Sequence, residues 1–168
     1  MIRTILFSSL LLLGCSFIQS TWLGAIAILG VVPDLALVAL IWISYKNGLV
    51  EGPVSGFLSG LAEDAISAAP FGFNAFVKTL TAALAGLLHG SFYIDRLLFP
   101  FVLGVAGTLV KALGAGFLAL LFGGGLQSYD FLGRSLWLEA AYNGVVAPIV
   151  FLLLGLGRSL LVTESKRE

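Results

Sequence analysis

Charged residues are scarce in this chain. Only 11% of the 168 residues are Asp, Glu, Lys or Arg, whereas 59% are apolar. Soluble domains carry about 25% charged residues, because their surfaces must be solvated by water. A soluble domain is therefore excluded, and the composition indicates that lipid is the solvent. The formal net charge of zero does not bear on nucleic-acid binding, but the lack of a basic stripe with interleaved aromatics excludes a nucleic-acid partner.

Cysteine and histidine each occur once. A single cysteine excludes an intrachain disulfide and a paired-thiol metal or redox motif. His89 lies near the end of an apolar segment, away from the acidic residues, so no Ser/His/Asp triad or metal-ligand set can form around it. The sequence also contains no GxxxxGK[ST] phosphate loop. We therefore expect no catalytic residue, no metal and no cofactor, and hence not an enzyme.

Long apolar runs make up most of the sequence. Hydropathy predicts an all-α polytopic membrane protein, a single integral membrane domain over residues 1–168, with about six helices in one bundle. The expected spans are 5–21, 23/33–45, 52–69, 73–89, 97–122 and 135–157. The second span begins either at Pro33 or after an outer segment over residues 22–32. The first span is expected to be retained, although the residues up to Cys15 resemble a lipoprotein processing box, which leaves cleavage as an alternative.

Basic residues predict the orientation of the spans. They fall mainly on one side, whereas Arg134 falls on the other, and basic residues accumulate on the cytoplasmic side of membrane proteins. The residues on the first side are Arg3, Lys46, Arg96, Arg158, Lys166 and Arg167. Both termini are therefore expected to be cytoplasmic.

Three glycines recur every fourth residue in the third span. Gly52, Gly56 and Gly60 share one helix face, and Asp64 continues the row. Small residues at this spacing allow close approach of another helix. The face is expected either to pack against the chain's own helices or to dock a helix of a partner.

Four charged residues are expected to form a cluster inside the membrane. If residues 70–72 form the turn of a helical hairpin, Asp64 and Lys78 lie at matching depth and can pair; Lys111 is expected at a similar level. Ions in lipid usually pair with one another, so Glu63, Asp64, Lys78 and Lys111 are predicted to form a charge-balanced group. It would act as a structural lock, a partner-docking site, or a substrate or proton pathway.

Other polar residues have simpler explanations. Asp34 is expected to cap the second span. Glu139 and Asn143 lie four residues apart in the last span, where they either line the interior that holds the charge cluster or satisfy each other.

Several of these segments together resemble one family. The matching pieces are Pro33-Asp34-Leu35, the stretch from Gly56 to Asp64, the stretch from Pro70 through Gly72 to Ala75, and the stretch from Asn143 to Pro148. They resemble the rod shape-determining protein MreD family over the whole chain. Glu63 departs from the family pattern, in which an apolar or small residue is more usual at this position.

The resemblance implies a non-catalytic scaffold in the bacterial inner membrane. Such a protein would act in the elongation complex with MreC, MreB and the peptidoglycan transpeptidase and glycosyltransferase, in contact with membrane lipid. The family is similar in fold to the S components of energy-coupling-factor transporters, so a substrate-binding subunit for a vitamin-type solute is the alternative. Fold likeness alone does not transfer a ligand.

Overall fold

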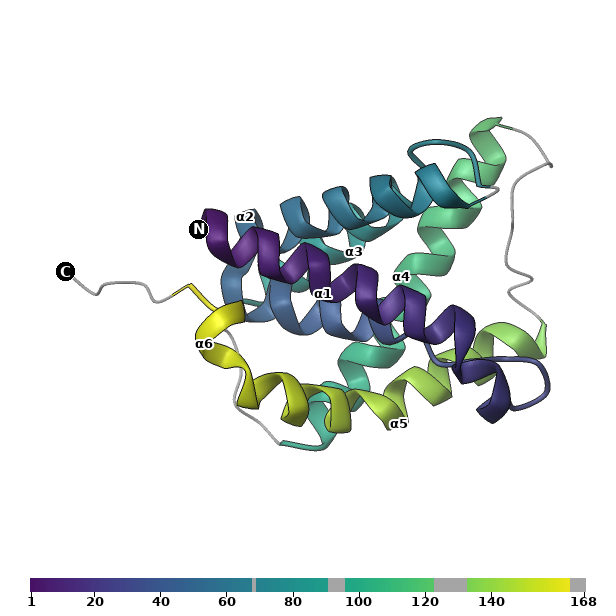
Figure 1. The fold of residues 1–168 in the computed structure, drawn as a ribbon. Coiled ribbons are helices and arrows are strands. Elements are labelled where there is room, and N and C mark those ends of the chain that lie inside the picture. The colour runs from purple at the N-terminus through teal and green to yellow at the C-terminus, as the bar shows by residue number, and fades with distance from the viewer. Residues whose placement is uncertain (68, 91–95, 123–132, 164–168) are drawn as a thin grey trace.

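The computed structural model describes residues 1–67, 69–90, 96–122 and 133–163. These residues form six α-helices and one short 3₁₀ helix, with no β-strand among them (Figure 1). The elements are α1 (Ile2–Thr21), η1 (Leu23–Ile26), α2 (Leu35–Ile66), α3 (Phe73–Leu87), α4 (Leu98–Phe122), α5 (Arg134–Leu156) and α6 (Arg158–Leu161). The all-α prediction is confirmed for this part of the chain.

Three of these helices are long and apolar enough to cross a membrane. They are α1, α4 and α5, with 20, 25 and 23 residues. A span needs about 20 apolar residues, and α3 has only 15. The structure therefore supports a membrane protein with three clear spanning helices, and the bundle of six spans stays a prediction.

Helix α2 contains both the second and the third expected span, because its chain reverses at Gly48. Gly48 has φ 80° and ψ −152°, a backbone conformation outside the helical region. Just beyond this point, a Cβ added to Gly52 would lie 2.6 Å from Ser44 Cα, whereas eight residues of straight helix span about 12 Å. The two arms of α2 therefore lie against each other. Helix α2 begins at Leu35, later than the expected start at Pro33, and ends at Ile66, three residues before the expected end of the third span.

The two ends of the described chain meet at one end of the molecule. Arg3 donates a hydrogen bond to the carbonyl of Ser159, with 3.0 Å between the atoms, and the hydroxyl groups of Thr163 and Thr4 are 3.1 Å apart. Asn47, beside the Gly48 reversal, donates to the carbonyl of Leu161 at 2.8 Å. The reversal in α2 therefore lies at the same end as both ends of the described chain.

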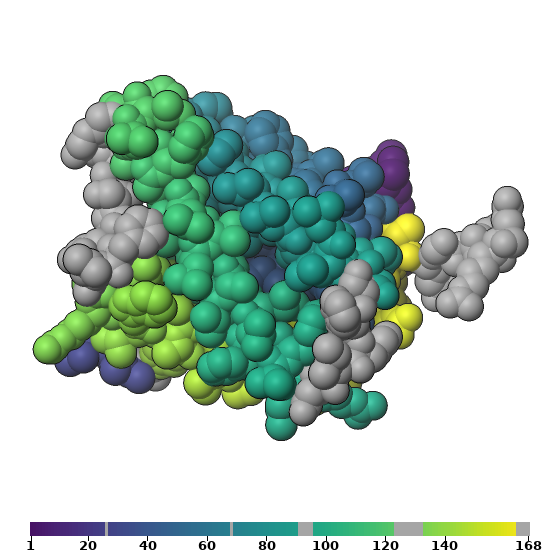
Figure 2. Space-filling model, turned by 180° about the vertical axis from the view of Figure 1, so that it is seen from behind, coloured from purple at the N-terminus to yellow at the C-terminus, as the bar shows by residue number. Residues whose placement is uncertain are grey.

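The core lies where α1, α2 and the C-terminal segment pack together. Its buried side chains include Leu12, Leu40 and Ile43, whose exposed fractions are 0%. α2 makes its largest contact with α3, and α4 with α5. From behind, Figure 2 shows a hollow between α3 and α4; it is an apolar groove that includes Ile41. Many large apolar side chains on α4 and α5 remain exposed, as lipid-facing residues of a membrane protein do.

The three glycines of the expected docking face are covered by the chain itself. Gly52 faces Ser44 in the other arm of α2, Gly56 faces Leu40 and the backbone of α3, and Gly60 lies against the backbone of Ala75. A partner helix has no access to a face that is already filled. The docking interpretation of this face is therefore corrected, since the glycines serve internal helix packing.

Gly60→Ala is expected to destabilise the protein. A Cβ at Gly60 would lie 2.5 Å from the backbone nitrogen of Ala75, and backbone cannot move aside cheaply. Overpacking of this kind costs about 1–3 kcal/mol. The measurement is the thermal unfolding midpoint in detergent, and Gly155→Ala, which meets nothing within 4 Å, is the control. Equal midpoints for the two variants would contradict the packing.

Candidate functional site

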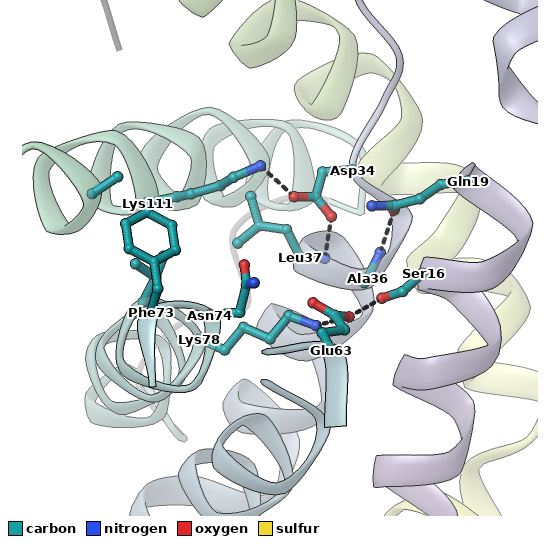
Figure 3. Close-up of a pocket in the computed structure, with 12 residues that line it drawn as sticks. Ser16, Gln19, Asp34, Ala36, Leu37, Glu63, Phe73, Asn74, Lys78 and Lys111 are labelled. Carbon is teal, nitrogen blue, oxygen red and sulfur yellow. Dashed lines mark hydrogen bonds and ion pairs between the residues drawn. The ribbon is translucent and has the colours of Figure 1, made fainter. Parts of the chain in front are cut away.

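Four charged residues line one polar cavity of about 170 Å³ (Figure 3). Its polar wall brings together residues that are far apart in the sequence. These are Ser16 and Gln19 from α1, Asp34 and Glu63 from the two ends of α2, Asn74 and Lys78 from α3, and Lys111 from α4. The reversal at Gly48 makes this possible, because it returns the end of α2 to the level of its beginning.

Asp64 caps helix α3. Its carboxylate accepts hydrogen bonds from the backbone nitrogens of Gly72 and Asn74, each at 2.9 Å, and from that of Ala75 at 3.2 Å. The side-chain amide of Asn74 donates a fourth bond at 2.9 Å. The first N–H groups of a helix lack partners within the helix, and a carboxylate also complements the positive end of the helix dipole. Asp64 therefore does not pair with Lys78, which corrects the predicted ion pair.

Glu63 is the partner of Lys78. The two form an ion pair in which the lysine and glutamate side chains are 11% and 17% exposed. The Ser16 hydroxyl donates to the same carboxylate oxygen, Oε1, and so connects α1 to the pair. Glu63 thus has a specific role, since it neutralises a lysine that would otherwise stand alone in an apolar bundle.

Lys111 is held by two carboxylates. Its ammonium lies 2.5 Å from Asp34 Oδ2 and 2.8 Å from Glu139 Oε1. Asp34 also accepts a hydrogen bond from the backbone of Leu37 at 2.9 Å, so it caps α2 as expected. The predicted single cluster is therefore divided into an α2–α3 pair and a group that joins α2, α4 and α5.

Asn143 connects α5 to this second group. It is fully buried, its side-chain oxygen accepts from the backbone nitrogen of Asp34 at 2.7 Å, and its amide donates to Thr108 of α4 at 2.9 Å. Of the two alternatives for Glu139 and Asn143, the structure shows the shared interior. Both residues contact the charge group, and no hydrogen bond joins them to each other in the described residues.

The other motif residues shape the backbone around the site. Pro33 lies buried next to Asp34, where the chain enters α2. Pro70 accepts a turn hydrogen bond from Phe73, and Gly72 adopts φ 96° at the start of α3, a conformation that favours glycine. Pro148 lies inside α5. Of these residues, Pro70 and Gly72 form the turn that places backbone N–H groups in front of Asp64.

Two residues of the site were not identified from the sequence. Ser16 donates to Glu63, and Gln19 accepts from the backbone of Ala36 at 3.3 Å. Both are polar residues one turn apart in a mostly apolar helix, which is the signal that would have indicated an inward face. His89 does not approach the cavity: its ring nitrogen lies 2.8 Å from the carbonyl of Tyr45, near the Gly48 reversal. The described residues contain no group of three acidic, His or Cys side chains placed to hold a metal.

Comparisons with known proteins identify the family of this chain. Neither the curated proteins nor the solved structures include a significant match. The family model of the rod shape-determining protein MreD, in contrast, matches residues 1–156. Because the match covers nearly the whole chain, the resemblance is confirmed, and the chain belongs to the MreD family of shape-determining membrane proteins.

Proposed function

We propose that this protein is a non-catalytic, multi-pass scaffold of the rod complex in the bacterial inner membrane. It helps to control cell shape and lateral peptidoglycan synthesis through contacts with an MreC-like protein, with MreB and with wall synthases. The observation that carries this proposal is the family match over residues 1–156. The three long apolar helices support the membrane location.

The ion pairs suit a scaffold. Charges inside a membrane are costly, and pairs that join different helices fix how those helices pack. Glu63 and Lys78 join the end of α2 to α3, while Lys111 joins α4 to the start of α2 and to α5. A bundle locked in this way presents a constant outer surface to its partners.

The expected orientation agrees with the arrangement of the ends. Arg3 and Arg158 lie where the two ends of the described chain meet, Lys46 lies beside the Gly48 reversal at the same end, and Arg134 begins α5. An excess of basic residues marks the cytoplasmic side. We therefore assign both termini to the cytoplasm within this proposal.

The transporter alternative is not favoured by the cavity. Sites for small-molecule ligands typically measure about 300–1,000 Å³, whereas this cavity measures about 170 Å³. A vitamin-type solute therefore has too little room. The scaffold remains the proposed function.

Isolation from the native membrane tests the scaffold. The tagged protein is purified in mild detergent, and co-purified proteins are identified by mass spectrometry against an unrelated tagged multi-pass protein. We expect enrichment of an MreC-like protein and of a wall transpeptidase or glycosyltransferase, and rounding of rod-shaped cells when the protein is depleted. Recovery of paired ATPase subunits with a coupling membrane protein, together with unchanged cell shape, would reject the proposal.

A further inference from the structure

The ion pairs that join the helices enclose a polar cavity whose contents the scaffold proposal does not address. About 170 Å³ remains between α1, the two ends of α2, α3 and α4. Polar cavities of this kind hold water or a polar ligand, since empty cavities in proteins are apolar. The cavity therefore has room for ordered water or for a small polar ligand.

The wall of the cavity carries both signs of charge. Lys78 and Lys111 contribute ammonium groups, and Asp34 and Glu63 contribute carboxylates. A lone anion entering the cavity would meet the carboxylates, and a lone cation would meet the ammonium groups. A group that carries both charges avoids this conflict and adds no net charge to the interior of the membrane protein.

Two acceptor atoms at the cavity have no donor among the described residues. Ser16 and Lys78 both contact Oε1 of Glu63, which leaves Oε2 without a donor among the described residues. Asn74 donates its amide nitrogen to Asp64. A carboxylate can only accept hydrogen bonds, so the side-chain nitrogen of Asn74 faces Asp64. The side-chain oxygen of Asn74 therefore faces away from Asp64, where no donor of the described residues reaches it. These two oxygens match the N–H groups of a primary ammonium.

A donor for an anionic group is also present. The ammonium of Lys78 has three N–H groups, and its one hydrogen-bond acceptor among the described residues is Glu63 Oε1. The apolar side chains of Leu37, Phe73 and Val77 complete the wall and suit a short carbon linker.

We propose that this cavity binds a small zwitterionic group that carries a primary ammonium and an anionic group a few bonds apart. The ammonium donates to Glu63 Oε2 and to the side-chain oxygen of Asn74, and the anionic group accepts from Lys78. A free solute of amino-acid size has this chemistry, and so has the headgroup of an ethanolamine phospholipid. This inference is independent of the rod-complex proposal.

Soluble probes test the chemistry on the purified full chain in detergent. The assay is run at about pH 5, where a phosphate monoester carries a single negative charge, so that phosphoethanolamine is a neutral zwitterion. At about ten times its Kd, phosphoethanolamine is expected to raise the thermal midpoint by about 4 °C. Phosphocholine, which has no N–H donor, ethanolamine and inorganic phosphate are expected to give no shift. Equal shifts from phosphate alone, or no shift from phosphoethanolamine at tens of millimolar in lipid-free detergent, would overturn the proposal.

Lipid bilayers distinguish the two sources of the group. The protein is placed in nanodiscs of phosphatidylcholine with or without phosphatidylethanolamine. A higher midpoint with phosphatidylethanolamine, and no further rise on adding phosphoethanolamine, identifies the lipid headgroup. A midpoint that is independent of the lipid but rises with phosphoethanolamine identifies a free solute, and both results support the zwitterionic site.

A variant that fills the cavity but leaves the ion-pair residues unchanged tests where phosphoethanolamine binds. Ala115 lines the cavity on α4, so Ala115→Leu adds apolar volume there and is expected to abolish the phosphoethanolamine shift. Leu113→Phe adds bulk two residues away on an exposed face of the same helix and is expected to retain the shift. Retention of the full shift in a folded Ala115→Leu protein would place the binding elsewhere and overturn the inference.

Discussion

Asp64→Ala is expected to destabilise the protein by at least about 3 kcal/mol, because each buried donor left without an acceptor costs about 1–3 kcal/mol. The carboxylate accepts from the backbone nitrogens of Gly72, Asn74 and Ala75 and from the side chain of Asn74. No other described side chain takes over these donors. The start of α3 should therefore fray, and with it the packing of α3 on α2.

The measurement for Asp64 is the thermal midpoint of the purified protein and its abundance in the membrane. Glu51→Ala is the matched control, since Glu51 is a carboxylate on the same helix whose side chain makes no hydrogen bond or ion pair in the described residues. We expect the control to behave like the wild type. A loss at Glu51 as large as that at Asp64 would contradict the capping role.

Lys78→Met is expected to destabilise the protein by about 3–5 kcal/mol, the typical cost of removing one partner from a buried ion pair. Glu63 would then hold an uncompensated negative charge in an apolar bundle. Adding Glu63→Gln removes that charge and still leaves an acceptor for Ser16. The double variant should therefore regain most of the lost stability.

A second double variant shows which carboxylate is the partner. Lys78→Met combined with Asp64→Asn should be less stable than Lys78→Met alone, because Asp64 serves as a cap and has no ion pair to lose. Midpoints of the three single and two double variants complete the comparison. Rescue by Asp64→Asn, with none by Glu63→Gln, would restore the pairing expected from the sequence and reject the one observed.

The helix positions could largely be predicted because lipid imposes a simple requirement on sequence. A spanning helix needs a long apolar run, and the runs that contain α1, α4 and α5 are interrupted by few charged residues. Hydropathy also located α3 and the turn before it. The reversal at Gly48 lies between the second and third predicted spans, where a loop was expected.

The pairing of charges could not be predicted with the same success. Residue spacing placed Asp64 opposite Lys78, but spacing specifies depth and not which of two adjacent carboxylates turns toward the lysine. Asp64 turns toward the N–H groups of the Gly72 turn, and this leaves Glu63 for Lys78. Asp34 and Glu139 are separated from Lys111 by 77 and 28 residues, so their convergence depends on how α2, α4 and α5 pack.

The sequence by itself determined the class of the protein, its apolar helices and its resemblance to the MreD family, because these depend on composition, on runs of neighbouring residues and on short motifs. Only the tertiary structure decided that the glycine face is filled from within, that Asp64 is a cap and that a polar cavity lies between four helices. These features depend on which side chains from distant segments meet. That choice is made by packing and by the need of each buried polar group for a partner.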